Sequence, residues 1–132
     1  SSLDNKEFTV YGNTYPTVDG TCIRDYVHVS DVARANKLAL DLIDFYDDAF
    51  VFNIGSSDGN SVFDIIGAVR EYTPLQVKFS VGDIRDGDPA VLVSDTKDTA
   101  NILGWKPKLG IDKIVKSAYT WYISEKYKNL SK

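Results

Sequence analysis

The sequence has very little cysteine and no methionine. Cys22 is the only cysteine among 132 residues, which excludes a disulfide bond within the chain and a zinc site built from several cysteines. We therefore expect a reducing compartment, namely the cytoplasm. Methionine is missing even from position 1, where an intact translated chain normally starts. This absence predicts a processed chain or a fragment of a longer one.

The sequence also lacks an excess of positive charge and long hydrophobic runs. Its 15 Lys and Arg residues face 19 Asp and Glu residues, giving a net charge of -4. No global positive field would draw the chain to nucleic acid or to an anionic membrane. Apolar runs such as residues 50–52 and 90–93 are far shorter than a membrane-spanning helix requires. The sequence therefore predicts a soluble protein that has neither a nucleic acid nor a membrane as its partner.

What is present is an ordinary globular composition, with 43% hydrophobic and 26% charged residues. This composition, without repeats or a linker, predicts one domain over residues 1–132. Hydrophobic periodicity predicts strands at residues 8–11, 23–29, 50–54, 76–81 and 90–93, and helices at 31–45, after Ser61, between Asp95 and Gly104, and at 111–122. The resulting order of β, β, α, β, α, β, β, α, α predicts an α/β fold, in which helices cover a small mixed sheet.

Two helix starts carry recognisable capping signals. Ser30 precedes the first helical pattern and is predicted to cap it. Ser61 and Asp64 have the spacing of a capping box. The lone His28 lies on the polar face of the second predicted strand. For this histidine, a packed residue bonded through one ring nitrogen is favoured over a catalytic role.

Cofactor and metal motifs are incomplete. Residues 55–59 (Gly-Ser-Ser-Asp-Gly) follow a predicted strand, but their spacing is not the G-x-G-x-x-G of a dinucleotide site. An ordinary turn between a strand and a helix is therefore favoured there. Three acidic residues, Asp83, Asp86 and Asp88, crowd one loop, yet their order does not match a calcium-binding loop. The sequence thus predicts neither a cofactor site nor a metal site.

Two arginines are candidate anion ligands. Arg24 lies on the polar face of a predicted strand, and Arg85 lies in the glycine-flanked loop 82–88. Two guanidinium groups from separate segments can clamp a diphosphate, because each offers a planar fork of donors. The alternative is that each arginine pairs with a neighbouring aspartate. Spacing alone favours that structural alternative, since most such pairs are structural.

Several runs of residues match a known family, in that family's order. They are residues 8–17, 19–33, 51–55, 85–90 and 103–107, and they resemble the UDP-glucose 4-epimerase family of extended short-chain dehydrogenase/reductases. The Arg-Asp-Tyr strand with its His-Val ending, joined to the loop before it, is specific to these epimerases and close relatives. The Leu-Gly-Trp-Lys-Pro element at residues 103–107 is shared more widely.

The resemblance implies the C-terminal, substrate-binding part of such an enzyme. The family's glycine-rich NAD turn and its Tyr-x-x-x-Lys pair lie upstream, so the Rossmann half is absent from these 132 residues and the cofactor NAD would be bound there. The implied partners are UDP-glucose and UDP-galactose. The resemblance further implies a homodimer for the intact enzyme, and no activity for this chain alone.

The resemblance also implies roles for seven residues. The strand that contacts uracil falls on Thr9, Val10 and Tyr11. The phosphate ligands fall on Arg24 and Arg85, and the acid near the ribose falls on Asp88. Leu92 falls on the position that faces the sugar ring, although a packed core residue in the strand at 90–93 is an equal alternative.

Two other functions remain open. A related epimerase could act on UDP-N-acetylhexosamines, UDP-pentoses or UDP-uronates. A freestanding UDP-binding module without a cofactor domain is the second alternative.

Overall fold

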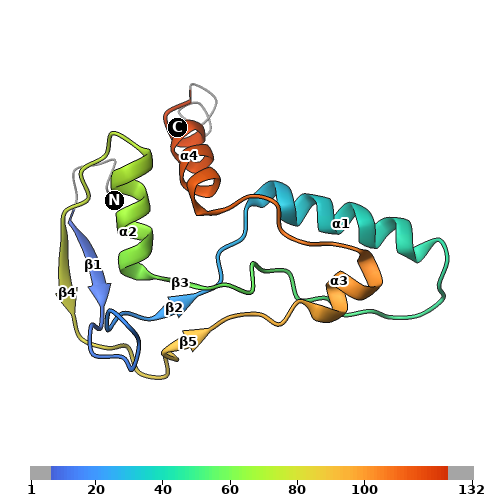
Figure 1. Ribbon diagram of the computed structural model, residues 1–132, viewed down its shortest axis with the longest axis horizontal. Helices are drawn as coiled ribbons and strands as arrows, with labels where there is room; N and C mark the ends of the chain where they lie inside the picture. The colour runs from blue at the N-terminus through green and yellow to red at the C-terminus, as the bar shows by residue number, and fades with distance from the viewer. Residues whose placement is uncertain (1–6, 125–132) are drawn as a thin grey trace.

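A computed structural model describes residues 7–124 of the chain, and its architecture is mixed α/β (Figure 1). The element order matches the predicted one except at the third strand, which was predicted at residues 50–54 and is found at Asn60–Ser61. The elements are β1 (Phe8–Tyr11), β2 (Ile23–Arg24), α1 (Val29–Ile43), β3 (Asn60–Ser61), α2 (Val62–Tyr72), β4 (Phe79–Gly82), β5 (Val91–Leu92), α3 (Lys97–Leu103) and α4 (Ile111–Tyr122).

Two small sheets form in place of the predicted single sheet. β1 pairs in parallel with β4, with Phe8 opposite Phe79. In the other sheet, β2 lies between antiparallel β3 and parallel β5. Ile23 is opposite both Ser61 and Val91. The second sheet brings three segments together that are far apart in the sequence.

The first hydrophobic core lies between the β1–β4 sheet and α2. Val10, Ile66 and Val77 are buried there, and Phe63 and Phe79 pack against them. The alternation of β1 directs Val10 inward, where it is 1% exposed. α2 also packs against α4.

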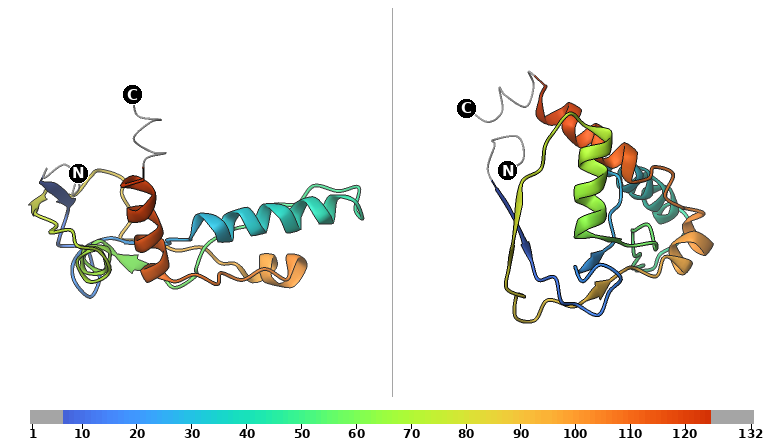
Figure 2. Two further views of the ribbon diagram at one scale, coloured as in Figure 1. Left: turned by 90° about the horizontal axis from the view of Figure 1, so that it is seen from above. Right: turned by 60° about the vertical axis from the view of Figure 1, so that its left-hand side comes forward.

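The second core lies between α1 and α3, which run side by side away from β1 and β4 (Figures 1 and 2). Ala35, Leu103 and Trp105 are its buried residues. The Trp105 ring is fully buried, and its Nε1–H donates to the carbonyl oxygen of Asp31 at 2.9 Å. Burial of this large ring anchors α1 to the segment after α3.

The cap of α1 differs from the prediction. His28, and not Ser30, is the N-cap, and its Nδ1 accepts from the Ser30 backbone N–H at 3.0 Å. The other ring nitrogen, Nε2, lies 2.8 Å from Ser117 Oγ on α4. His28 is therefore packed as expected, but it caps a helix and does not lie on a strand, and both of its ring nitrogens are bonded. The capping box of Ser61 and Asp64 on α2 is also confirmed. Within residues 7–124, none of the helices has the length and apolar character that crossing a bilayer requires.

Three strand predictions need correction. The strand at residues 23–29 ends at Arg24, because the chain then turns into α1 at Val29. Residues 50–54 form no strand, since no described segment pairs with them. The strand at 90–93 is reduced to β5, whose residues are more than half exposed and not buried as predicted.

The carboxylate of Asp25 holds the second sheet together. It accepts from the backbone N–H and hydroxyl of Ser56, both at 2.6 Å. It also accepts from the backbone N–H of Ser94 at 3.0 Å and from the Ser94 hydroxyl. Asp25 thus ties the end of β2 to the segment after β5 and to the turn before β3.

We predict that Asp25 makes stability sensitive to acid. Burial opposes ionisation, but the hydrogen bonds from Ser56 and Ser94 outweigh it and lower the pKa of Asp25 from 3.8 to about 2. Because the folded-state pKa lies below the unfolded value, this stabilisation is complete above the ordinary pKa. It is lost as the pH falls towards 2. Asp25→Asn should lower the free energy of unfolding by about 1.5–3 kcal/mol at pH 7.

Chemical denaturation at pH 7 and at pH 2 measures this effect. The difference between wild type and Asp25→Asn should shrink at the lower pH. Asp47→Asn, at an exposed position, is the matched control. An equal loss of stability at both pH values would contradict the role of the ionised carboxylate.

Candidate functional site

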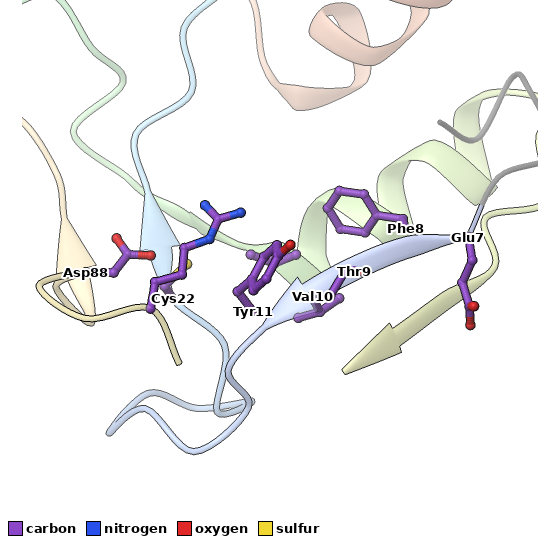
Figure 3. A pocket seen from close by; sticks show the side chains of 9 residues that line it. Glu7, Phe8, Thr9, Val10, Tyr11, Cys22 and Asp88 are labelled. Atoms are coloured by element: carbon purple, nitrogen blue, oxygen red, sulfur yellow. The ribbon is translucent and has the colours of Figure 1, made fainter. Parts of the chain in front are cut away.

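A cavity of about 460 Å³ lies along β1 (Figure 3). Residues from four separate segments line it, which are Glu7, Phe8, Thr9, Val10, Tyr11, Cys22, Val62, Arg85 and Asp88. In Figure 3, the labelled β1 side chains follow one wall of the cavity, and Cys22 and Asp88 lie beyond its Tyr11 end. Five of the seven residues singled out from the sequence therefore meet at one cavity.

The β1 wall combines a core residue with exposed polar and aromatic groups. Val10 is buried, whereas Tyr11 is 42% exposed. The Arg85 guanidinium carbon lies 3.7 Å from the centroid of the Tyr11 ring. This cation–π contact places a charged donor at the end of β1. Within residues 7–124 Arg85 forms no ion pair, so the pairing with a neighbouring aspartate is wrong for this arginine.

Arg24 does pair with an aspartate, but with one far away in the sequence. Its Nη2 donates to Asp88 Oδ1, and its Nη1 donates to the carbonyl oxygen of Ile23 at 2.7 Å. Both side chains of the pair remain partly exposed. Asp88 lines the cavity, so Arg24 reaches the edge of the cavity through its ion pair. The loop that carries Arg85 therefore also carries Asp88, the partner of Arg24.

The loop between β1 and β2 buries a tyrosine that sequence reasoning did not select. The Tyr15 backbone N–H donates to the carbonyl oxygen of Gly20 at 2.9 Å, which closes the loop. The ring packs against Gly12, where an added Cβ would lie 2.7 Å from Tyr15 Cε2. In the sequence, Gly12 and Gly20 flank this short polar loop. That pattern could have indicated a buried residue between them.

The Tyr15 hydroxyl is buried and has no hydrogen-bond partner within the described chain. Burial raises the pKa of this phenol, and the nearby negative charge of Asp88 raises it further. Cys22 acts in the same direction, while the positive charges of Arg24 and Arg85 oppose it. The phenol therefore lies within electrostatic reach of the groups at the end of the cavity.

Cys22 and Leu92 lie differently from their sequence interpretation. Cys22, for which the sequence predicted no role in the site, is 8% exposed and lines the cavity. Leu92 is 60% exposed on β5, opposite Arg24 in register. The alternative that Leu92 is a packed core residue is therefore wrong for this chain. Leu92 does not line the cavity along β1.

The turn at residues 55–59 does not provide a dinucleotide site. This turn packs tightly against Asp25, since a Cβ at Gly55 would lie 2.1 Å from Asp25 Oδ2. Its backbone N–H groups at Ser56 and Ser57 point to that carboxylate, so they are not free for a pyrophosphate. Among residues 7–124 no group of three His, Cys, Asp or Glu side chains could hold a metal ion.

Comparisons with known proteins find relatives that are similar in sequence. A model of the NAD dependent epimerase/dehydratase family matches residues 1–55. A UDP-glucose 4-epimerase of Lacticaseibacillus casei is 44% identical over 114 residues, which are 86% of this chain and 34% of the relative.

Solved structures agree as well. A UDP-glucose 4-epimerase from Stenotrophomonas maltophila, with bound NAD and formylated UDP-arabinopyranose, superposes with a TM-score of 0.89 at 32% identity. The match covers 99% of this chain and 38% of that one. The enzyme from Bifidobacterium longum, in complex with NAD+ and UDP, gives a TM-score of 0.84 at 34% identity, over 95% of this chain and 37% of that one.

The mixed α/β fold of this chain is therefore the one found in part of these UDP-glucose 4-epimerase structures. The chain is similar to UDP-glucose 4-epimerases over nearly its whole length. It spans about a third of the length of the curated relatives that it matches.

We predict that the loop carrying Tyr15 depends on Gly20. Its φ is +80°, and a Cβ there would lie 2.1 Å from the carbonyl oxygen of Asn13. Gly20→Ala should therefore destabilise the protein by about 1–3 kcal/mol, measured by chemical denaturation.

Gly67→Ala in α2 is the matched control, since an added Cβ meets nothing within 4 Å. This control should be neutral or stabilising by about 0.5–1 kcal/mol. A Gly20→Ala variant as stable as the control would show that the loop is not constrained as described.

Proposed function

We propose that this chain is the UDP-sugar-binding part of an NAD-dependent UDP-glucose 4-epimerase. One observation carries the proposal: the cavity along β1 presents Arg85, which has no ion pair among residues 7–124, and Asp88 with its partner Arg24. A cavity with unneutralised guanidinium charge in a chain of net charge -4 is suited to a local anion. The bound UDP and UDP-sugar described for the relatives support this assignment.

The nucleoside would lie along β1. In the described sheet β1 pairs with β4 only, so its other edge has backbone N–H and C=O groups free to bind. A uracil ring has a donor and acceptors along one side that such an edge can match. Thr9, Val10 and Tyr11 are the residues proposed to contact it. Asp88 would accept from a ribose hydroxyl.

The diphosphate would lie between Arg24 and Arg85. In this structure Asp88 partly neutralises Arg24. A diphosphate carries more negative charge than one carboxylate and can accept from both guanidinium forks at once. Binding would therefore draw Arg24 from Asp88 towards the phosphates, which frees the Asp88 carboxylate for the ribose.

NAD supplies the hydride chemistry at C4 of the sugar, and we assign its binding to residues outside these 132. The task of this chain is then to hold UDP firmly and leave the hexose free to turn. Binding energy from the remote nucleotide thereby orients the reacting carbon. We expect the complete enzyme to be a cytoplasmic homodimer that interconverts UDP-glucose and UDP-galactose, and this chain alone to be inactive.

We predict that each arginine contributes to UDP affinity. In the complete enzyme, Arg24→Ala and Arg85→Ala should each weaken UDP binding by about 1.5–3 kcal/mol, measured by titration calorimetry. Arg→Lys at either position should restore only part of the affinity, because the planar fork is lost. Arg70→Ala is a control, since Arg70 lies on α2 and its guanidinium donates to the carbonyl oxygen of Val77. Unchanged affinity in both site variants would contradict the proposal.

We also predict that Leu92 influences sugar choice. Its exposed side chain on β5 is opposite Arg24, so the sugar beyond the diphosphate would meet it. Because the Leu92 side chain is intermediate in bulk, the enzyme should favour UDP-glucose and UDP-galactose over their N-acetyl forms. Leu92→Gly should raise the relative kcat/KM for UDP-N-acetylgalactosamine by about tenfold, and Leu92→Tyr should lower it. An unmoved substrate ratio in a stable Leu92→Gly enzyme would remove Leu92 from the sugar site.

A further inference from the structure

An apolar groove runs between α2 and α4, which pack against each other (Figure 1). Two cavities of about 310 Å³ and 360 Å³ form it, and they share Tyr26, Ile65 and Val69. The first cavity reaches Phe8 on β1, and the second reaches Tyr122 on α4. We call the two cavities together the α2–α4 groove. Within residues 7–124 no charged side chain lines this groove, so its lining favours an apolar occupant.

The described chain leaves the groove open. Ile65 and Val69 on its α2 wall are only partly buried, and Ala118 on its α4 wall is exposed. Soluble proteins rarely expose a continuous apolar surface of this kind unless something binds to it. The groove is therefore a binding surface, and its occupant is apolar on the side that enters the groove.

The ends of the chain have too few hydrophobic residues to supply that occupant. Residues 1–6 contain Leu3 as their one hydrophobic residue, and residues 125–132 contain Tyr127 and Leu130. The other residues of both ends are polar or charged. This chain spans about a third of the length of its curated relatives. A longer polypeptide of the same kind has ample further sequence to fill the groove.

We propose that the α2–α4 groove is the docking site for an amphipathic helix from the part of the polypeptide that precedes these 132 residues. This inference rests on the proposed function, which assigns NAD binding to residues outside this chain. Backbone groups within α2 and α4 are bonded inside each helix, so an occupant packs on side chains, as a helix does. Phe8 places one end of the groove next to residue 7, where the described chain starts.

Docking in this groove brings the rest of the enzyme next to the proposed diphosphate site. Tyr26 lines both cavities and follows Arg24 by two residues. Asp25, between them, is already held by Ser56 and Ser94. A helix packed on Tyr26 therefore restrains the segment that carries Arg24 from its other side.

Thiol labelling of Ile65→Cys in the complete protein tests whether the groove is covered. Ile65 lines both cavities and is partly exposed in the described chain, so its protection requires an occupant. A maleimide should modify this thiol about 100-fold more slowly in the native protein than in denaturant. The rate is measured by mass spectrometry of the peptide that contains residue 65. Glu71→Cys is the matched control, because Glu71 is exposed on α2 and lines neither cavity, and it should react rapidly in both states.

Photo-cross-linking identifies the occupant. With p-benzoylphenylalanine in place of Tyr122, irradiation of the complete protein should join this position to a segment that precedes residue 1 of the same molecule. The cross-linked protein should therefore keep the mass of one polypeptide. The same photoreactive residue in place of Tyr46, which is 56% exposed beyond the end of α1, should not join to that segment.

Rapid labelling of Ile65→Cys in the native protein would overturn the inference. A cross-link from position 122 to a second copy, to another protein, or to no preceding segment would overturn it as well. Titration of the wild-type complete protein with UDP keeps the two proposals apart. If UDP binds while Ile65→Cys reacts as fast as Glu71→Cys, only this inference fails. If UDP does not bind, the proposed function fails, whatever the labelling shows.

Discussion

The carboxylate of Asp25 is the constraint on which the positions of the functional residues depend. β2 and β5 have two residues each, too few for ladder hydrogen bonds to fix their register alone. Asp25 follows Arg24 directly and accepts from Ser94, two residues after Leu92, and from Ser56 in the turn before β3. The hydrogen bonds of Asp25 therefore hold together three segments whose short strands would not fix the sheet by themselves. Arg24 and Leu92 hold their relative positions because of a side chain that does not line the cavity.

The electrostatics of the cavity follow from a local imbalance within an acidic chain. Nineteen acidic residues exceed 15 basic ones overall, yet Asp88 pairs with Arg24 and not with Arg85 near the end of β1. Arg85 packs its guanidinium on the Tyr11 ring and leaves its donors unpaired by any acid within the described chain. Local charge, and not net charge, decides which ligand such a cavity favours.

The sequence run that is most specific to the epimerases contains both a candidate ligand and residues that stabilise the fold. Arg24 is a candidate phosphate ligand and pairs with Asp88, which lines the cavity. Asp25 fixes the second sheet, and His28 caps α1 and contacts Ser117 on α4. Asp31 accepts the backbone N–H groups of Lys108 and Leu109, both at 2.9 Å. Most residues of this run therefore make polar contacts that stabilise the fold. Such contacts tolerate few other side chains, which explains why these residues resemble those of the family.

The sequence by itself determined the four helices, β1, the capping box of α2, and the identity of the two arginines as candidate ligands. These features depend on local periodicity and on residue type, which a sequence displays directly. The tertiary structure alone decided that Arg24 pairs with Asp88, 64 positions away, that residues 50–54 form no strand, and that Tyr15 is buried without a partner. Strand pairing, ion pairing and burial each require two distant segments to meet. The distance between them in space is set by the whole fold and not by either segment.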